Sequence, residues 1–464
     1  MNFDNTYKTL PPTFYSNTKP SEFSQPNLLA FNDELAKELG FDPDQYTSEE
    51  LAKIFSGQIL LEGSAPIALA YAGHQFGNFV PQLGDGRAIM LGEVLTKNSK
   101  RYDLQLKGSG RTVFSRGGDG FSALGPVIRE YILSEAMYAL GIPTTRALAA
   151  VETGDLVRRE TVLPGGVFTR VASSHIRVGT FEYFAGKKDI NAIKVLLSYA
   201  IERHYPHLKK DDALGFLKAV IEKQIELVSS WMSIGFIHGV MNTDNTSISG
   251  ETIDFGPCAF MDKFSQAKVF SSIDQYGRYA YNNQGPILSW NMTRLAECLI
   301  DLVDVDESKA IGVLNETLSR IKPKFESALN KKMTAKIGLT EEDNDLVAEF
   351  LEILEKEKKD FTLSFRNLGN GDFPEFEQKW VMRLIERGKK PDEILDQIKA
   401  VNPLYIPRNH QVEKAIQGAL RQDLSTFQEL NELLKNPFQF NPKLDRYKQE
   451  PTEDEIVCET FCGT

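Results

Sequence analysis

Two short polar segments in the second half of the chain carry residue types that could act on a phosphate. The first is His238-Gly239-Val240-Met241-Asn242-Thr243-Asp244-Asn245, and Asp254-Phe255-Gly256 begins nine residues after its end. Kinase-type phosphotransferases place an Asp and an Asn on a catalytic loop and a metal-binding Asp in Asp-Phe-Gly. Mg²⁺ needs hard oxygen ligands around the phosphates, while a separate carboxylate accepts the proton of the attacking hydroxyl.

Two earlier segments contain residues suited to holding phosphates. Gly84-Asp85-Gly86-Arg87 precedes a predicted strand, and its glycines let backbone N–H groups approach a phosphate while the arginine adds charge. Lys107 ends the next predicted strand, and Glu130 follows it in a predicted helix. A lysine that contacts phosphates needs a carboxylate to fix its ammonium group. Each motif alone is common, but all four in this order are typical of a kinase-like fold.

One position departs from the kinase pattern. Small-molecule kinases of this type often read His-Gly-Asp-x-x-x-x-Asn, whereas here Val240 occupies the position of the catalytic Asp. Valine cannot accept a proton. Two interpretations remain open: the chain is an inactive kinase, or Asp244, directly before Asn245, accepts the proton in a rearranged site.

Regularly patterned elements must position these residues. The alternation of apolar and polar residues predicts strands at 88–94, 102–107, 147–152 and 166–171. A helix with Pro126 in its first turn is predicted to end at Gly141, and a longer helix over 214–232 precedes the polar loop. Between the loop and Asp254 we predict a hairpin, with strands at 246–249 and 252–254 and Gly250-Glu251 in a II′ turn.

The change of pattern along the chain predicts four parts. A β-rich segment with one helix, followed by a mainly helical segment, is an α+β and two-lobed pattern. We therefore predict a protein-kinase-like fold with extensions at both ends. Its parts would be an N-terminal extension with irregular and short helical stretches (1–80), an N-lobe (81–170), a C-lobe with the catalytic loop (171–325), and a helical C-terminal extension with a cysteine-bearing tail (326–464).

Composition disfavours several other classes of protein. The 53 Lys and Arg residues against 64 Asp and Glu give a net charge of −11, which disfavours non-specific binding to nucleic acid. No apolar run reaches the roughly 18 residues of a membrane span, and the first residues do not resemble a secretion signal. Four cysteines are too few for a disulfide scaffold. We predict a cytoplasmic protein with no nucleic-acid or membrane partner.

Beyond these general signals, long stretches of the sequence resemble the selenoprotein O family, and the similarity covers nearly the whole chain. The resemblance implies a pseudokinase-fold protein adenylyltransferase that transfers AMP from ATP to Ser, Thr or Tyr hydroxyls of proteins. It also implies a nucleotide that lies flipped relative to ordinary kinases, with its α-phosphate presented to the acceptor. The stretches are Tyr71-Ala72-Gly73-His74-Gln75-Phe76-Gly77, Gln82–Ala88, Leu104–Gly110, His238–Asn245 and Ile253–Pro257.

The resemblance also implies roles for single residues. Asp244 would be the proton acceptor, and Asn245 and Asp254 would hold Mg²⁺, with Mn²⁺ as an alternative. Arginines suit a reversed triphosphate, because guanidinium groups bind phosphate oxygens well. The implied nucleotide-binding positions, including the lysine–glutamate pair and the metal-binding Asp, are Gly84, Gly86, Arg87, Lys107, Asp119, Gly120, Glu130, Arg170, Arg177 and Asp254.

A cysteine near the end of the chain matches the position of selenocysteine in eukaryotic members of the family. In the family, a tail cysteine can bond to a cysteine that follows the metal-binding Asp, so the resemblance implies a redox-active pair of Cys258 and Cys462.

Other functions remain open. A conventional kinase would transfer the γ-phosphate, but Val240 argues against it. A non-catalytic nucleotide-binding scaffold would need no base, yet Lys107, Asn245 and Asp254 are all retained. Transfer of UMP with Mn²⁺ is a further alternative.

Overall fold

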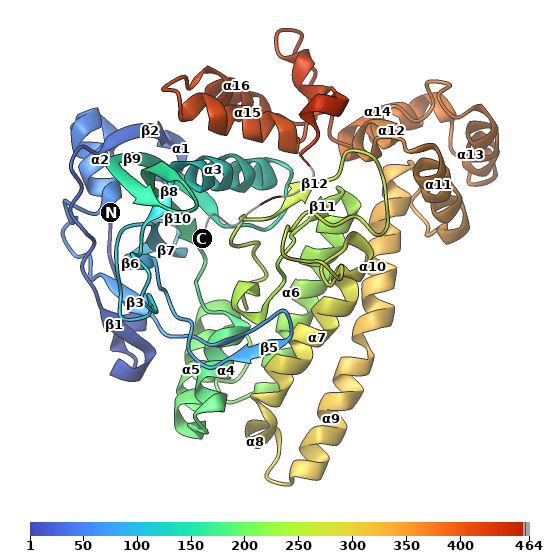
Figure 1. Ribbon diagram of the computed structural model, residues 1–464. Coiled ribbons are helices and arrows are strands. Elements are labelled where there is room, and N and C mark those ends of the chain that lie inside the picture. Colours follow the sequence, from blue (N-terminus) through green and yellow to red (C-terminus); the bar gives the residue numbers. More distant parts are fainter. Residues whose placement is uncertain (458–459, 461–464) are drawn as a thin grey trace.

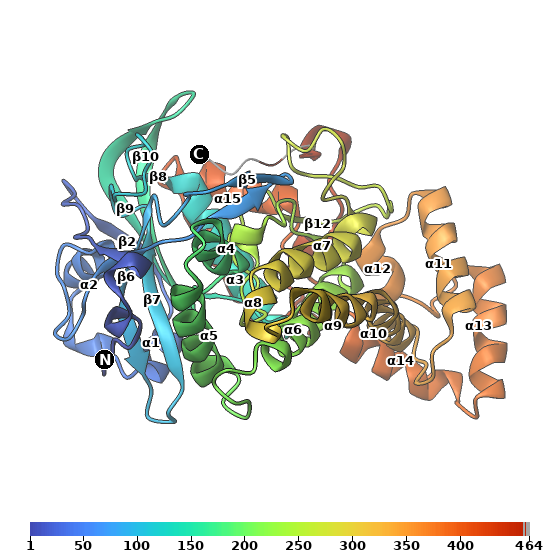
Figure 2. The same ribbon diagram turned by 90° about the horizontal axis from the view of Figure 1, so that it is seen from below.

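Strand-forming and helix-forming sequences occupy different regions of the molecule. The computed structural model describes residues 1–457 and Thr460. Figure 2 shows the strands of the main sheet at one end, a group of long helices in the middle, and α11 and α13 at the far end. The architecture is mixed α/β, with a sheet region followed by a helical region, as the sequence pattern predicts.

An antiparallel sheet dominates the first part of the chain. Within the described residues it has eight strands in the order β1-β3-β6-β7-β10-β9-β2, with β8 paired to β10. The four predicted strands are confirmed as β6, β7, β9 and β10, while β1, β2 and β3 lie where the pattern predicts only irregular and short helical stretches. The bounds are β1 (Tyr15–Asn17), β2 (Asn27–Phe31), β3 (Ile67–Leu69), β6 (Ala88–Leu95), β7 (Arg101–Lys107), β8 (Ser122–Ala123), β9 (Arg146–Arg158) and β10 (Val162–Ala172).

Helices enclose apolar cores against this sheet. The predicted helix that contains Pro126 is confirmed as α3 (Leu124–Ala139), which contacts β9 and β10. Two helices from near the C-terminus, α15 (Asn409–Ala419) and α16 (Ser425–Leu434), lie alongside α3 and share its apolar core (Figure 1). A separate core joins β6, β7, β9 and β10 to α1 (Asp33–Glu38) and α2 (Ser48–Ser56).

The helical region is centred on α6 (Ala213–Ser233), which confirms the predicted long helix. Its inward residues, among them Phe216, Leu217 and Val220, are fully buried, and it packs against α7 and α10. No helix in the described part of the chain is both long and apolar enough to cross a membrane. The other helices are α4 (Val178–Gly186), α5 (Ile190–His204), α7 (Gln284–Glu297), α8 (Ile300–Val303), α9 (Glu307–Ser319), α10 (Ile321–Lys336), α11 (Asn344–Glu357), α12 (Phe361–Arg366), α13 (Pro374–Glu386) and α14 (Pro391–Val401).

The predicted hairpin between the polar loop and Asp254 is wrong. Gly250 does form a turn with φ of +76°, but the two flanking segments pair with other parts of the chain instead of each other. Ser247 bridges to Arg177, and Thr252 bridges to Thr144. Backbone hydrogen bonds from Thr252 to Pro143 and from Thr145 to Thr252 show that distant partners outcompete the local pairing.

Two small two-stranded sheets complete the framework near the polar loop. β11 (Phe236–Ile237) pairs with β12 (Ala259–Phe260) and so brackets the segment from His238 to Cys258. β4 (Gly73–Gln75) pairs with β5 (Asn78–Val80) and contacts both α4 and the short turn at Thr243–Asn245. Residues that are far apart in sequence thereby meet around the polar loop.

Candidate active site

A cavity of about 720 Å³ lies between the sheet and the helical region. Its size is that of a small-molecule or cofactor site. Nearly all residues proposed from the sequence line it, and Glu130 lies behind Lys107. We call it the central cavity; the predicted residues in its lining are Gly84, Gly86, Arg87, Lys107, Asp119, Gly120, Arg170, Arg177, Asp244, Asn245 and Asp254.

Three cationic side chains converge on the carboxylate of Asp254. Lys107 Nζ lies 2.8 Å and Arg170 Nη1 2.8 Å from Oδ1, while Arg177 Nη1 lies 3.1 Å from Oδ2. Burial opposes ionisation of Asp254, but the three cations outweigh it and hold its pKa well below the usual range. Asp254 also has a φ of +63°, a left-handed conformation that is unusual for a residue other than glycine. A charged carboxylate is thus fixed among cations that could bind phosphate.

The lysine at the end of β7 is held as the sequence predicts. Lys107 Nζ donates to Glu130 Oε1 at 2.5 Å, and both side chains are buried. Glu130 belongs to α3, so this ion pair ties the helix to the sheet directly beside the central cavity.

Close backbone packing shapes the glycine-rich wall of the central cavity. Gly84 has a φ of +67°, and a side-chain carbon there would lie 2.3 Å from the ring of Phe114. On the same wall, Gly120 has a φ of +77°, and a side-chain carbon would meet the carbonyl oxygen of Gly110 at 2.2 Å. Only glycine fits these two positions without displacing the chain. Asp119 is partly exposed and forms an ion pair with Arg159 at 2.8 Å.

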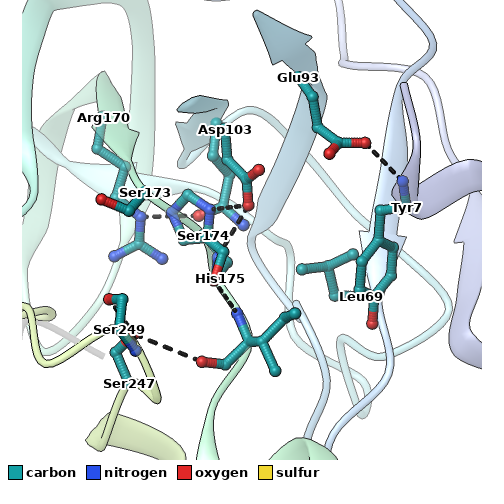
Figure 3. Close-up of polar contacts among 12 residues, drawn as sticks. Tyr7, Leu69, Glu93, Asp103, Arg170, Ser173, Ser174, His175, Ser247 and Ser249 are labelled. Atoms are coloured by element: carbon teal, nitrogen blue, oxygen red, sulfur yellow. Dashed lines mark hydrogen bonds and ion pairs between the residues drawn. The ribbon is translucent and has the colours of Figure 1, made fainter. Parts of the chain in front are cut away.

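A buried polar network braces the linker between β10 and α4. Asp103 accepts hydrogen bonds from the backbone N–H of His175 at 2.8 Å and pairs with its Nδ1 at 3.0 Å (Figure 3). Burial lowers the pKa of His175 to about 4, which keeps the ring neutral at physiological pH. Arg203 bonds to Asp103 and also to the Ser173 carbonyl. Since Arg170 belongs to β10 and Arg177 follows this linker, the network holds Arg177 close to the strand that carries Arg170.

Asp244 lines the central cavity together with Val240, which occupies the usual kinase base position. Asp244 is 7% exposed, and burial raises its pKa to about 6 despite the nearby Arg177 guanidinium. Arg177 Nη1 donates to the Asp244 carbonyl at 2.7 Å, and Gln75 Nε2 donates to Asp244 Oδ2 at 3.2 Å. Val240 lines the same cavity without any group that could accept a proton.

The residues present suit a hard divalent cation. The carboxylate of Asp254 and the amide of Asn245 both reach the central cavity, and they offer the oxygen ligands that Mg²⁺ prefers. No group of three or more His, Cys, Asp or Glu side chains suited to a metal occurs in the part of the chain that the structure describes. Two protein ligands completed by phosphate oxygens and water are typical of Mg²⁺ in phosphate-transferring enzymes.

Sequence reasoning missed several residues that line the central cavity. Asp85 is 1% exposed, accepts a hydrogen bond from the Leu69 backbone N–H, and has its pKa raised to about 6 by burial. Its position between two glycines of the predicted phosphate loop was the available signal. Arg159, the partner of Asp119, follows β9 and carries no motif that could have revealed it.

The predicted redox pair consists of Cys258 and Cys462. Cys258 is fully buried, four residues after Asp254. Cys462 lies outside the described residues. Thr460 is described: it bridges to Ser271, and its hydroxyl donates to the Pro257 carbonyl at 2.5 Å.

The fold and the site gather cations and carboxylates in one cavity, an arrangement that suits an enzyme acting on a phosphorylated substrate. Residues 1–390 match the profile of the family described as "Protein adenylyltransferase SelO". A "Protein nucleotidyltransferase YdiU" from Rhodopseudomonas palustris (strain ATCC BAA-98 / CGA009) is 50% identical, over 100% of this chain and 99% of the relative. Proteins of the same name from Nitrobacter hamburgensis and Agrobacterium fabrum are 50% and 49% identical over 100% of this chain, and over 96% and 100% of their own lengths. The chain therefore belongs to the SelO family of protein adenylyltransferases.

Proposed function

We propose that the chain transfers AMP from ATP to Ser, Thr or Tyr hydroxyls of proteins and releases pyrophosphate. The observation that carries this proposal is the convergence of Lys107, Arg170 and Arg177 at Asp254 in the central cavity. Such a cluster suits the charge of a triphosphate that lies reversed relative to ordinary kinases. Val240 leaves the usual base position without a proton acceptor, which disfavours transfer of the γ-phosphate.

We infer that the sheet and helical regions correspond to the two lobes of a kinase-like fold. In support, the Lys107–Glu130 pair joins β7 to α3, and Asp254-Phe255-Gly256 follows the polar loop. The division at residues 80, 170 and 325 remains our proposal for the domains. Strands β1–β3 extend the sheet beyond the proposed N-lobe, so the N-terminal extension contributes to the same layer.

In the proposed mechanism, six polar residues of the central cavity have assigned roles. Lys107, Arg170 and Arg177 bind phosphate oxygens, and Asp244 accepts the proton of the acceptor hydroxyl. The hydroxyl oxygen attacks the α-phosphorus in line while the bond to the bridging oxygen breaks, so AMP joins the protein and pyrophosphate leaves. Asn245 and Asp254 would hold Mg²⁺, or Mn²⁺ as the alternative, which when bound neutralises charge on the phosphates.

Separate labelling of ATP at the α- and γ-phosphates tests this function. We expect protein acceptors to gain the α-label, with a mass increase of one AMP, and no γ-label. Transfer of the γ-label alone would restore the conventional kinase, whereas binding of ATP without transfer of either label would favour the non-catalytic scaffold. Parallel reactions with UTP and Mn²⁺ measure the nucleotide preference.

We propose further that Cys258 and Cys462 form a reversible disulfide in a cytosol that normally keeps both thiols reduced. In support, Thr460, two residues before Cys462, is hydrogen-bonded to Pro257, the residue before Cys258. Bond formation would release two protons and two electrons to a disulfide oxidant. We expect oxidation to lower transfer to protein acceptors and Cys462→Ala to abolish that sensitivity. Peptide mapping of the non-reduced protein checks the pairing, and a Cys458–Cys462 bridge would contradict it.

A further inference from the structure

The stretch Tyr71–Gly77 resembles the family closely but has no role in the mechanism above. Most of it forms β4 and the turn into β5, which lie apart from the main sheet. Figure 1 shows β5 next to α4 and α7 of the helical region, apart from the main-sheet strands β1, β3 and β6. The N-terminal part of the chain therefore sends one hairpin across to the helical region.

This hairpin forms hydrogen bonds with three consecutive residues of the polar loop. The backbone N–H of His74 donates to Thr243 Oγ1 at 2.6 Å, and the backbone N–H of Phe76 donates to Asn242 Oδ1 at 3.1 Å. Between them, the Gln75 side chain donates to Asp244 Oδ2 at 3.2 Å. The hairpin thus forms one hydrogen bond with each of these three loop residues, and such specific contacts indicate more than apolar packing.

The buried carboxylate of Glu182 contacts both the hairpin and the polar loop. Thr243 Oγ1 donates to Glu182 Oε2 at 2.5 Å, and Glu182 Oε1 pairs with His74 Nδ1 at 2.5 Å. Glu182 belongs to α4 and its side chain is only 4% exposed. Because the Thr243 hydroxyl both donates and accepts, its rotamer is fixed between the hairpin and α4.

The hairpin contacts both oxygens of the Asp244 carboxylate. Oδ2 accepts the hydrogen bond from Gln75, whereas Oδ1 is buried and has no hydrogen-bond partner among the described residues. Gly73 keeps the backbone close, since a side-chain carbon there would lie 2.6 Å from Oδ1. The orientation of the carboxylate is therefore set by the hydrogen bond from Gln75 at Oδ2 and by the close backbone of Gly73 at Oδ1.

We propose that Gln75 is a positioning residue that orients the Asp244 carboxylate toward the acceptor hydroxyl, with His74, Glu182 and Thr243 fixing the loop beneath it. This inference rests on the proposed function, in which Asp244 is the proton acceptor. Gln75 would act through Asp244 on the transfer step and not on the affinity for ATP. The N-terminal hairpin would then belong to the catalytic machinery of the helical region.

The test compares Gln75→Met, which keeps the length of the side chain but removes its donor, with Asn78→Ala. Asn78 is the exposed cross-strand partner of Gln75, so its variant controls for disturbance of the hairpin. We expect Gln75→Met to lower kcat for α-label transfer by about 10- to 100-fold, because small misplacements of a reacting group cost rates of this size. ATP affinity should stay within twofold, and Asn78→Ala should behave as wild type.

The Asp244→Asn background separates positioning from general damage. If Gln75 acts through Asp244, Gln75→Met should cause no further loss of the residual transfer in this background. An equal loss in both backgrounds, weakened ATP binding, or wild-type kcat for Gln75→Met would overturn the inference. If Asp244→Asn transfers nothing, the split between kcat and ATP affinity decides alone. Wild-type turnover of Asp244→Asn would instead overturn the proposed base itself.

Discussion

Asp254→Asn is expected to lower AMP transfer by at least about 1,000-fold, because it removes the only charged ligand proposed for Mg²⁺. Asparagine keeps the shape of the side chain, so the local conformation at φ of +63° is preserved as far as a substitution allows. Transfer is measured with α-labelled ATP over a range of Mg²⁺ and Mn²⁺ concentrations. Metal-dependent transfer within tenfold of wild type would contradict the role of Asp254.

The same variant has a second expected effect that follows from the cation cluster. The negative charge of Asp254 is paired with the positive charges of Lys107, Arg170 and Arg177 in the native protein. The Asn variant removes that negative charge and leaves the three cations facing the central cavity. We therefore expect ATP without metal to bind as tightly as to wild type or more tightly, even though transfer is lost. Calorimetric titration in the presence of a chelator measures this affinity.

A matched control addresses the cost of breaking a buried ion pair. Asp262 lies eight residues further along and forms an ion pair with Arg408, away from the lining of the central cavity. Arg408 keeps Asp360 as a second partner at 2.7 Å. Asp262→Asn should therefore retain wild-type transfer, and a comparable loss there would show that Asp254→Asn acts through stability.

The parts of the fold that the sequence predicts well are those with strong local patterns. β6, β7 and α6 carry long periodic runs of apolar residues, and each lies within a few residues of its predicted bounds. β1 and β3 have three residues each, too few to show any alternation, and they form only because the sheet offers a neighbour. The predicted hairpin after the polar loop failed for the same reason, since tertiary pairing decided its partners.

The residues of the candidate site also fall into two groups: those that the sequence motifs indicate, and those that only the family resemblance or the structure reveals. Lys107, Glu130 and Asp254 follow from motif order, because each lies at a fixed place relative to a strand, helix or turn. Arg170 and Arg177 carry no local signal and enter only through the family resemblance. The contact of Gln75 with Asp244 spans 169 residues of sequence, and neither residue's surroundings indicate the other. Side chains that work in pairs across such distances become visible only in three dimensions.

Asp244→Asn is expected to lower kcat by about 100- to 10,000-fold, the usual contribution of a general base. Asp244 is the carboxylate best placed to accept the proton, because Asp254 is committed to three cations and Asp85 is held by Leu69 and Gln105. ATP affinity should stay within about twofold, since a base acts on the acceptor hydroxyl and the phosphates are held by other groups.

The paired measurement of turnover and nucleotide binding distinguishes this variant from Asp254→Asn. Loss of kcat with retained, metal-dependent ATP binding identifies a residue that acts after the nucleotide has bound. Because Asn keeps an oxygen that can accept the hydrogen bond from Gln75, the polar loop should keep its conformation, and thermal unfolding should match wild type. If Asp244→Asn turns over at the wild-type rate, the proton leaves by another route.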